Sequence, residues 1–323
     1  MHDPHAVNSV IETPDASAVD GQVRWDPARS LWNGGTMAVT LVLCPLTLTP
    51  AAALLFVALT GATLLFGHSV GFHRRLIHRS FECPQWLEYV LVWWGVQVGM
   101  CGPLGIIRTH DLRDWAQRQP ACHPYLSHAN PMIKDGWWQL HCRLELDTPP
   151  QFDLGAVGRS RFYRFLQASW MAQQIPTALL LWWAGGWSFV VWGVCARTFV
   201  CVHGHWFVGH LAHNRGPQHW IVDGAGVQAH DVPWAGLITM GEAWHNNHHA
   251  FPGSARIGLY PGQSDLGYAF IRLLEKLRLA WKVRTPETLP VRRELVAAGS
   301  ADGHGFQTRR PVELRCRARE LKA

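Results

Sequence analysis

The sequence is poor in charged residues. Only 16% of its 323 residues are Asp, Glu, Lys or Arg, against about a quarter in ordinary soluble domains. It contains 18 Trp and 19 His, which is a large stock of potential metal ligands. The formal net charge of +6 suits attraction to anionic lipid headgroups, and we expect no nucleic acid partner. This composition indicates a membrane metalloprotein.

Several familiar motifs are also missing. The eight Cys residues include no CxxC pair, which argues against a disulfide framework or a zinc ribbon and suits a reducing compartment. Residues 1–30 lack the basic start and short apolar core of a signal peptide, so we expect a retained, polar cytoplasmic leader. We find no Gly-rich nucleotide loop and no nucleophile elbow.

Two long runs carry no charge at all. Residues 31–67 are too many for one membrane span and are broken near Pro45 to Pro50, and residues 168–196 contain the turn-forming pair Gly185-Gly186. Since a spanning helix needs about 20 residues, each run predicts two helices in a hairpin. We expect the spans at about 31–49, 51–67, 168–184 and 187–203.

The basic residues lie in the remaining connections. The positive-inside rule therefore places these connections and both termini in the cytoplasm. The apolar segment 86–107 is interrupted at Gly102-Pro103, and we interpret it as re-entrant or interfacial. Residues 291–323 are basic and poor in large apolar residues, so we expect a mobile tail or a lipid-surface contact.

These segments define the predicted fold. We expect an all-α integral membrane protein, with four transmembrane helices in two hairpins and a cytoplasmic helical cap that carries the histidines. The predicted divisions are a leader over 1–30, a membrane domain over 31–285 and a basic tail over 286–323.

The histidines gather at the cytoplasmic ends of the predicted spans. Residues three and four apart share a face of an α-helix, so His245, His248 and His249 are expected to aim at a common point. His73 and His78 are five apart, roughly 140° around an α-helix, which fits two metals or a helix end better than one site. A set rich in imidazole and free of thiolate differs from most structural zinc sites. A dinuclear metal centre is the prediction.

These residues resemble the membrane fatty acid desaturases, in particular the acyl-CoA and acyl-lipid group with three histidine boxes. "GFHRRLIHRSF" resembles the first box, HxxxxH, and "GEAWHNNHHAFP" resembles the third, HxxHH followed by FP. "RTFVCVHGHWFVGHLAH" resembles the segment with an additional ligand, which falls on His213. The resemblance covers roughly residues 31–285.

The resemblance implies a centre of two iron ions that activates dioxygen and removes two hydrogens from an acyl chain bound in an apolar tunnel. The substrate would be an acyl-CoA, an acyl-ACP or an acyl-lipid. Electrons would come from a separate cytochrome b5-type or ferredoxin-type protein. The implied ligands are His73, His78, His110, His213, His245, His248 and His249.

The second box departs from the family pattern. The family has HxxHH, whereas this chain has "HDLRD", which keeps His110 but has Arg113 and Asp114 where two imidazoles belong. Guanidinium stays protonated and offers no lone pair, so Arg113 cannot bind a metal. Gly209 also stands where the family has Asn. The possible substitute ligands are Asp111, Asp114, His68, His205 and His210.

Three functions remain open at this point. The leading hypothesis is desaturation of a fatty acyl chain, with no catalytic residues beyond the metal ligands. Hydroxylation of a lipid or another membrane-soluble substrate shares the first hydrogen abstraction, so ligand spacing does not separate the two. The altered second box also leaves room for a non-catalytic membrane metal-binding protein, but transport sites usually place ionisable groups inside the spans, where this chain has few.

Overall fold

The computed structural model describes residues 9–299, and most of them are helical. Two π-helical segments interrupt the α-helices: η1 (Thr63–Ile77) continues α2, and η2 (Val191–Ala196) lies between α9 and α10. Pro233–Ala235 forms a short 3-10 helix, η3. The α-helices are α1 (Pro27–Thr47), α2 (Pro50–Ala62), α3 (Gln85–Val96), α4 (Pro103–Arg118), α5 (Pro124–Ser127), α6 (Met132–His141), α7 (Gly155–Arg159), α8 (Arg161–Ser169), α9 (Gln174–Val190), α10 (Arg197–Asn214), α11 (His245–Ala250) and α12 (Leu266–Lys276).

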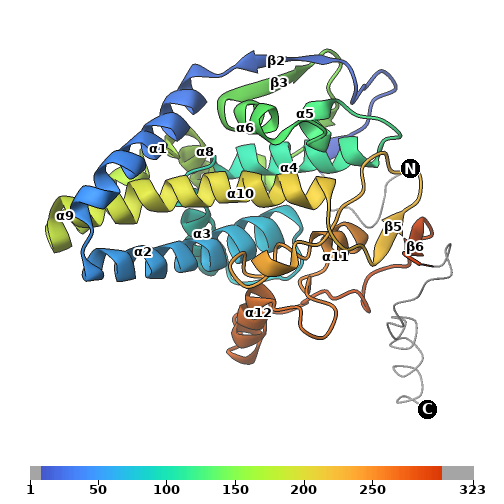
Figure 1. Ribbon diagram of the computed structural model, residues 1–323. Coiled ribbons are helices and arrows are strands. Elements are labelled where there is room, and N and C mark those ends of the chain that lie inside the picture. The colour runs from blue at the N-terminus through green and yellow to red at the C-terminus, as the bar shows by residue number, and fades with distance from the viewer. Residues whose placement is uncertain (1–8, 300–323) are drawn as a thin grey trace.

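The two predicted turns are present. Thr49 caps α2 by accepting a hydrogen bond from Ala52 N, and Pro50 occupies the first turn, where a missing N–H costs nothing. Gly185 and Gly186 break α9, since Gly186 has φ +68°, which glycine adopts most readily. Figure 1 shows α1 and α2 meeting at one end of the molecule, next to the end of α9.

Two helical segments within residues 9–299 are long and apolar enough to cross a membrane. They are Pro50–Ile77, which joins α2 to η1, and Gln174–Asn214, which joins α9, η2 and α10. Leu54 on α2 and Trp183 on α9 are largely exposed, as expected of lipid-facing side chains. These two segments are therefore candidate spans of a helical membrane protein. The α3 helix has only 12 residues, too few to span a bilayer.

The prediction of an all-α fold is wrong in one respect, because three short antiparallel strand pairs join segments distant in sequence within residues 9–299. They form because the chain before α1 and after α12 packs on the cap, in runs too short for an alternating pattern to reveal. The pairs are β1 (Val10–Ile11) with β4 (Gln151–Phe152), β2 (Gly21–Trp25) with β3 (Cys142–Leu146), and β5 (Trp220–Val222) with β6 (Leu295–Ala297).

The prediction of a mobile tail from residue 291 is also wrong for the part that the structure describes. The β6 strand lies in this stretch, and Arg292 Nη1 donates hydrogen bonds to the carbonyls of His249 and Ala250. These are terminal carbonyls of α11, which have no partner within their own helix. Residues 300–323 of the predicted tail and 1–8 of the leader lie outside the described residues.

Close packing fixes the position of η1. A Cβ on Gly67 would lie 2.3 Å from Trp94 O, and one on Gly71 would lie 2.4 Å from Leu91 O, so only glycine lets η1 approach α3 this closely. At the far end Arg74 is 1% exposed, and its Nη2 lies 2.8 Å from Asp265 Oδ1. Asp265 also caps α12 by accepting from Tyr268 N. The η1 helix is thus held between α3 and α12 where it carries the first box.

Candidate metal centre

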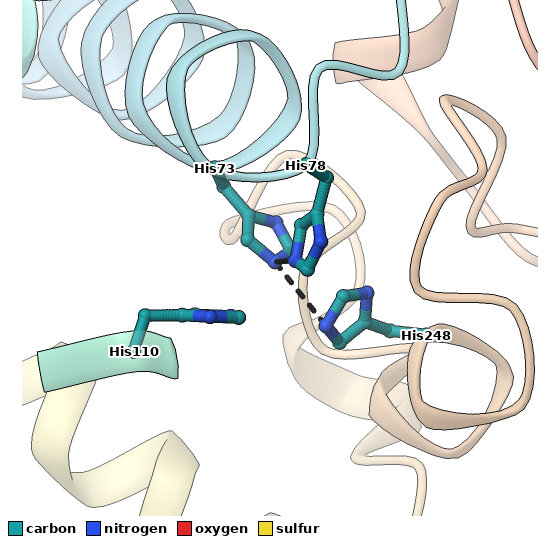
Figure 2. Close-up of side chains that lie close together, drawn as sticks. All are labelled: His73, His78, His110 and His248. Atoms are coloured by element: carbon teal, nitrogen blue, oxygen red, sulfur yellow. Dashed lines mark hydrogen bonds between the residues drawn. The ribbon is translucent and has the colours of Figure 1, made fainter. Parts of the chain in front are cut away.

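The predicted ligands lie in two groups. His73, His78, His110 and His248 form the four-histidine group, and His213, His245 and His249 form the three-histidine group, with the ligand atoms of each group within 4.8 Å of one another. Figure 2 shows the rings of the four-histidine group turned toward one another from three separate parts of the chain. These parts are η1 with the residue that follows it, α4 and α11.

The π-helical winding brings His73 and His78 into one group. In a π-helix the N–H of residue i+5 bonds to the carbonyl of residue i, and His78 N donates to His73 O at 3.1 Å. The two Nε2 atoms are 3.2 Å apart. Of the two alternatives expected for this pair, the helix end is confirmed, since His78 is the C-cap of η1, and the separation between two metal groups is wrong, because it assumed α-helical winding.

The third box divides between the two groups. His245 and His249 are one α-helical turn apart, and their Nε2 atoms lie 3.1 Å from each other. His248 instead faces His73, with 3.3 Å between the Nε2 atoms. The expectation that all three would aim at one point is therefore wrong, because the short α11 helix lies between the groups and presents one face to each.

The imidazoles have the chemistry that a metal ion requires. Burial lowers the pKa of His78, His245 and His248 well below the ordinary value, and the neighbouring histidines lower it further. Burial likewise lowers the pKa of His249 to about 4, although Asp114 opposes this. Neutral imidazoles whose Nε2 lone pairs converge cannot all hydrogen-bond to one another. The arrangement fits metal ions held by nitrogen.

Carboxylates lie behind the four-histidine group. Glu242 Oε2 is in close contact with His73 Nδ1, and Glu242 Oε1 accepts a hydrogen bond from Ser69 Oγ at 2.5 Å. Burial acts to raise the pKa of Glu242, but His73 and Arg74 lower it to about 2, so it is a carboxylate. Asp111 Oδ1 is 3.5 Å from His110 Nδ1. Such partners orient ligating imidazoles and make them more basic. Sequence analysis missed Glu242, although it stands three residues before His245.

The possible substitute ligands belong to neither group. Asp111 Oδ2 accepts hydrogen bonds from the backbone and side chain of Ser9. Asp114 accepts from Arg118 at 2.9 Å; burial acts to raise its pKa, but Arg118 and nearby histidines lower it below its ordinary value. His68 and His205 form a ring pair with centroids 4.8 Å apart.

His210 belongs to a third group, which sequence analysis missed. His128 Nδ1 and His210 Nδ1 lie 2.8 and 3.0 Å from Asp135 Oδ2, and Trp206 Nε1 donates to the same oxygen at 2.9 Å. Burial acts to raise the pKa of Asp135, but these donors, His128 first, lower it to about 2. His128 and Asp135 match no motif, so only the fold reveals them.

A buried aspartate holds α11 in place. Asp231 is 1% exposed, and its Oδ1 accepts from Asn246 N at 3.0 Å. Burial raises the pKa of Asp231 to about 7, despite backbone hydrogen bonds that lower it. The folded protein therefore keeps a proton that the unfolded chain loses near pH 4, and stability falls as pH rises from about 4 to about 7.

We expect Asp231→Asn to weaken this pH dependence, because the amide oxygen still accepts from Asn246 and the side chain no longer ionises. In the wild type, ionisation of Asp231 between about pH 4 and about pH 7 lowers the free energy of unfolding by at most about 4 kcal/mol. Thermal melts of both proteins at about pH 5 and about pH 8 measure it. An equal change in melting temperature in the two proteins would contradict the prediction.

Apolar helices beside two groups of converging imidazoles are the features of a membrane protein with a candidate histidine-rich metal site. No protein-family model matches the chain. Similar proteins include an sn-1 stearoyl-lipid 9-desaturase from Anabaena variabilis, 36% identical over 72% of this chain and 82% of the relative. An acyl-CoA 5-desaturase from Anemone leveillei is 31% identical over 80% of each chain. The palmitoyl-monogalactosyldiacylglycerol delta-7 desaturase of Arabidopsis thaliana is 30% identical over 82% of this chain and 72% of the relative.

The chain belongs to the membrane fatty acid desaturase family. It is an enzyme of the oxidoreductase class. The names of these relatives do not favour the hydroxylase or the non-catalytic alternative.

Proposed function

We propose that this protein introduces a double bond into a fatty acyl chain, using two iron ions and dioxygen. The observation that carries the proposal is the convergence of seven imidazoles into two adjacent groups in a chain whose relatives are desaturases. His248 lies with its ring centroid 5.7 Å from those of both His245 and His249. The two groups are therefore close enough to act on one substrate.

The proposed ligands are the seven histidines of the two groups. When bound, the iron ions would supply the activation of dioxygen that hydrogen removal from an unactivated methylene requires. The chain's own part is to present neutral imidazoles in a fixed geometry. Glu242 orients His73, and the buried ion pair between Arg74 and Asp265 fixes the end of η1. Burial of His78 and His248, each 3% exposed, keeps bulk water away.

We further propose that the protein crosses the membrane four times, in two hairpins with cytoplasmic termini. The broken helix at Gly185-Gly186 supports one hairpin and the break at Leu48-Thr49 supports the other. The exposed leucines on α1, such as Leu41 and Leu46, support lipid contact for that helix too. In this arrangement the membrane domain is 31–285, and the metal centre lies at the cytoplasmic ends of the spans.

The acyl chain would be carried on a lipid or on coenzyme A, as the names of the relatives suggest for those proteins. An acyl-ACP is a third carrier of the same chemistry. Electrons would come from a separate cytochrome b5-type or ferredoxin-type protein, because reduction of dioxygen with removal of two hydrogens also needs two external electrons.

Expression in a host that lacks acyl desaturases tests the proposed function. We expect new monounsaturated acyl chains in the total lipids when iron and a compatible reductase system are supplied, measured by mass spectrometry. Oxygenated acyl chains without new double bonds would favour hydroxylation instead. An unchanged lipid profile from correctly inserted, iron-loaded protein would contradict both activities.

A further inference from the structure

The two histidine groups differ in composition. The four-histidine group takes imidazoles from η1 and the residue after it, from α4 and from α11, whereas the three-histidine group takes them from α10 and α11 alone. The second box of the family would add imidazoles at positions 113 and 114, and here those positions hold Arg and Asp.

The surroundings of the four-histidine group favour a bound cation. Glu242 is in contact with His73 Nδ1, and Asp111 lies behind His110. Both carboxylates are buried beside the imidazoles that they face. Their negative charge offsets the charge of a metal ion and strengthens the imidazole ligands.

A fixed positive charge lies on the His213 side of the three-histidine group, whereas Asp114, paired with Arg118, lies toward His249. Arg113 Nη1 is in close contact with His128 Nε2, and Nη2 donates to Gln139 Oε1 at 2.8 Å, so neither acceptor is a carboxylate. The ring of His128 stacks on that of His213, with centroids 5.4 Å apart and 7° between the planes. Among the described residues, His213 Nδ1 has no hydrogen-bond partner, and the same holds for Nδ1 of His110 and His248 in the four-histidine group.

The third group fixes Arg113 in this position. Asp135 is fully buried and holds His128 through Nδ1, which leaves Nε2 of the same ring to accept from Arg113. His210 and Trp206 donate to the same carboxylate oxygen. Since three N–H donors already use this oxygen, we interpret the group as an anchor for Arg113 rather than as a third metal site. The compensating carboxylate lies one imidazole away from the guanidinium.

We propose that the two metal sites are unequal: the four-histidine group holds its ion tightly, and the three-histidine group holds its ion more weakly by about tenfold or more. The cause is Arg113, which His128 and Asp135 anchor beside His213 in place of an imidazole ligand. This inference rests on the metal centre of the proposed function, and it concerns affinity rather than the reaction.

Metal retention tests the inference without an activity assay. The full-length protein in detergent is loaded anaerobically with iron(II) and then dialysed against rising concentrations of a chelator. Iron per chain is measured by mass spectrometry of the metal. We expect the wild type to lose iron in two steps, with one of its two ions leaving at a chelator concentration about tenfold lower than the other.

Two variants of Arg113 identify the cause. Arg113→His restores a nitrogen ligand and removes the charge, so we expect the early step to shift toward the late one. Arg113→Gln removes only the charge and should give a smaller shift in the same direction. Arg143→Gln, a change on the exposed side of β3, should release iron as the wild type does.

The outcomes separate this inference from the proposed function. Loss of both wild-type ions in a single step overturns the inference and leaves the proposed function standing. The inference is also overturned if the first release of iron occurs at the wild-type chelator concentration in both Arg113→Gln and Arg113→His. Circular dichroism checks that Arg113→His is folded. Failure of the wild type to bind any iron contradicts the proposed function together with the inference. Desaturation by a wild-type protein that also releases its iron in two unequal steps supports both the proposed function and the inference.

Discussion

Replacement of His248 by alanine is expected to lower acyl-chain desaturation by about 100-fold or more. His248 brings α11 into the four-histidine group, and its Nε2 faces that of His73 at 3.3 Å. Its ring is also 5.7 Å from those of both His245 and His249, so it lies where the two groups meet. The measurement is the monounsaturated fraction of total lipid, together with iron per chain.

A matched histidine change controls for this prediction. His230 lies outside the three groups, and its Nδ1 is 2.9 Å from Gly216 O on the protein surface. His230→Gln should therefore keep both its iron and its activity. If His248→Ala desaturates acyl chains as well as the wild type does, at equal amounts of protein in the membrane, His248 is not part of the proposed centre.

Replacement of Glu242 by glutamine is expected to weaken iron binding at the four-histidine group by about 10- to 100-fold. The amide keeps the shape of the side chain but removes the negative charge beside His73 and leaves Arg74 with Asp265 as its charged partner. Desaturation should fall with iron content, and excess iron should restore part of it. Chelator titration and lipid analysis of the same preparation measure both effects.

Glu145→Gln is the matched control, because Glu145 lies on the antiparallel strand pair of β2 and β3, where it pairs with Arg24 and is exposed. An exposed ion pair contributes little to stability, so iron binding should not change. Full iron retention in Glu242→Gln, with activity equal to that of the control, would show that the carboxylate behind His73 has no part in metal binding.

The local sequence was sufficient to predict where the long helices turn. Thr49-Pro50 and Gly185-Gly186 produce breaks through capping, fixed proline φ and glycine's positive φ, which act over a few residues whatever the surroundings. The first and third boxes likewise identified the family, because their spacing is a property of the linear chain. The seven predicted histidines all lie in the two groups.

The grouping of these histidines was not predictable from spacing. The assumption of 3.6 residues per turn separates His73 from His78, but packing of Gly67 and Gly71 against α3 accompanies a π-helical η1 that brings them together. The α11 helix has six residues, so its position between the two groups determines where each imidazole points.

The sequence by itself determined the family, the two breaks in the long helices and the seven histidines that gather in the two groups, because these depend on residue type and short-range spacing. Only the tertiary structure decided which histidines share a group and what surrounds them. Glu242 beside His73, and Asp135 holding His128 against Arg113, are contacts between segments distant in sequence. Burial strengthens such charge interactions by excluding water, and no pattern along the chain records which segments burial brings together.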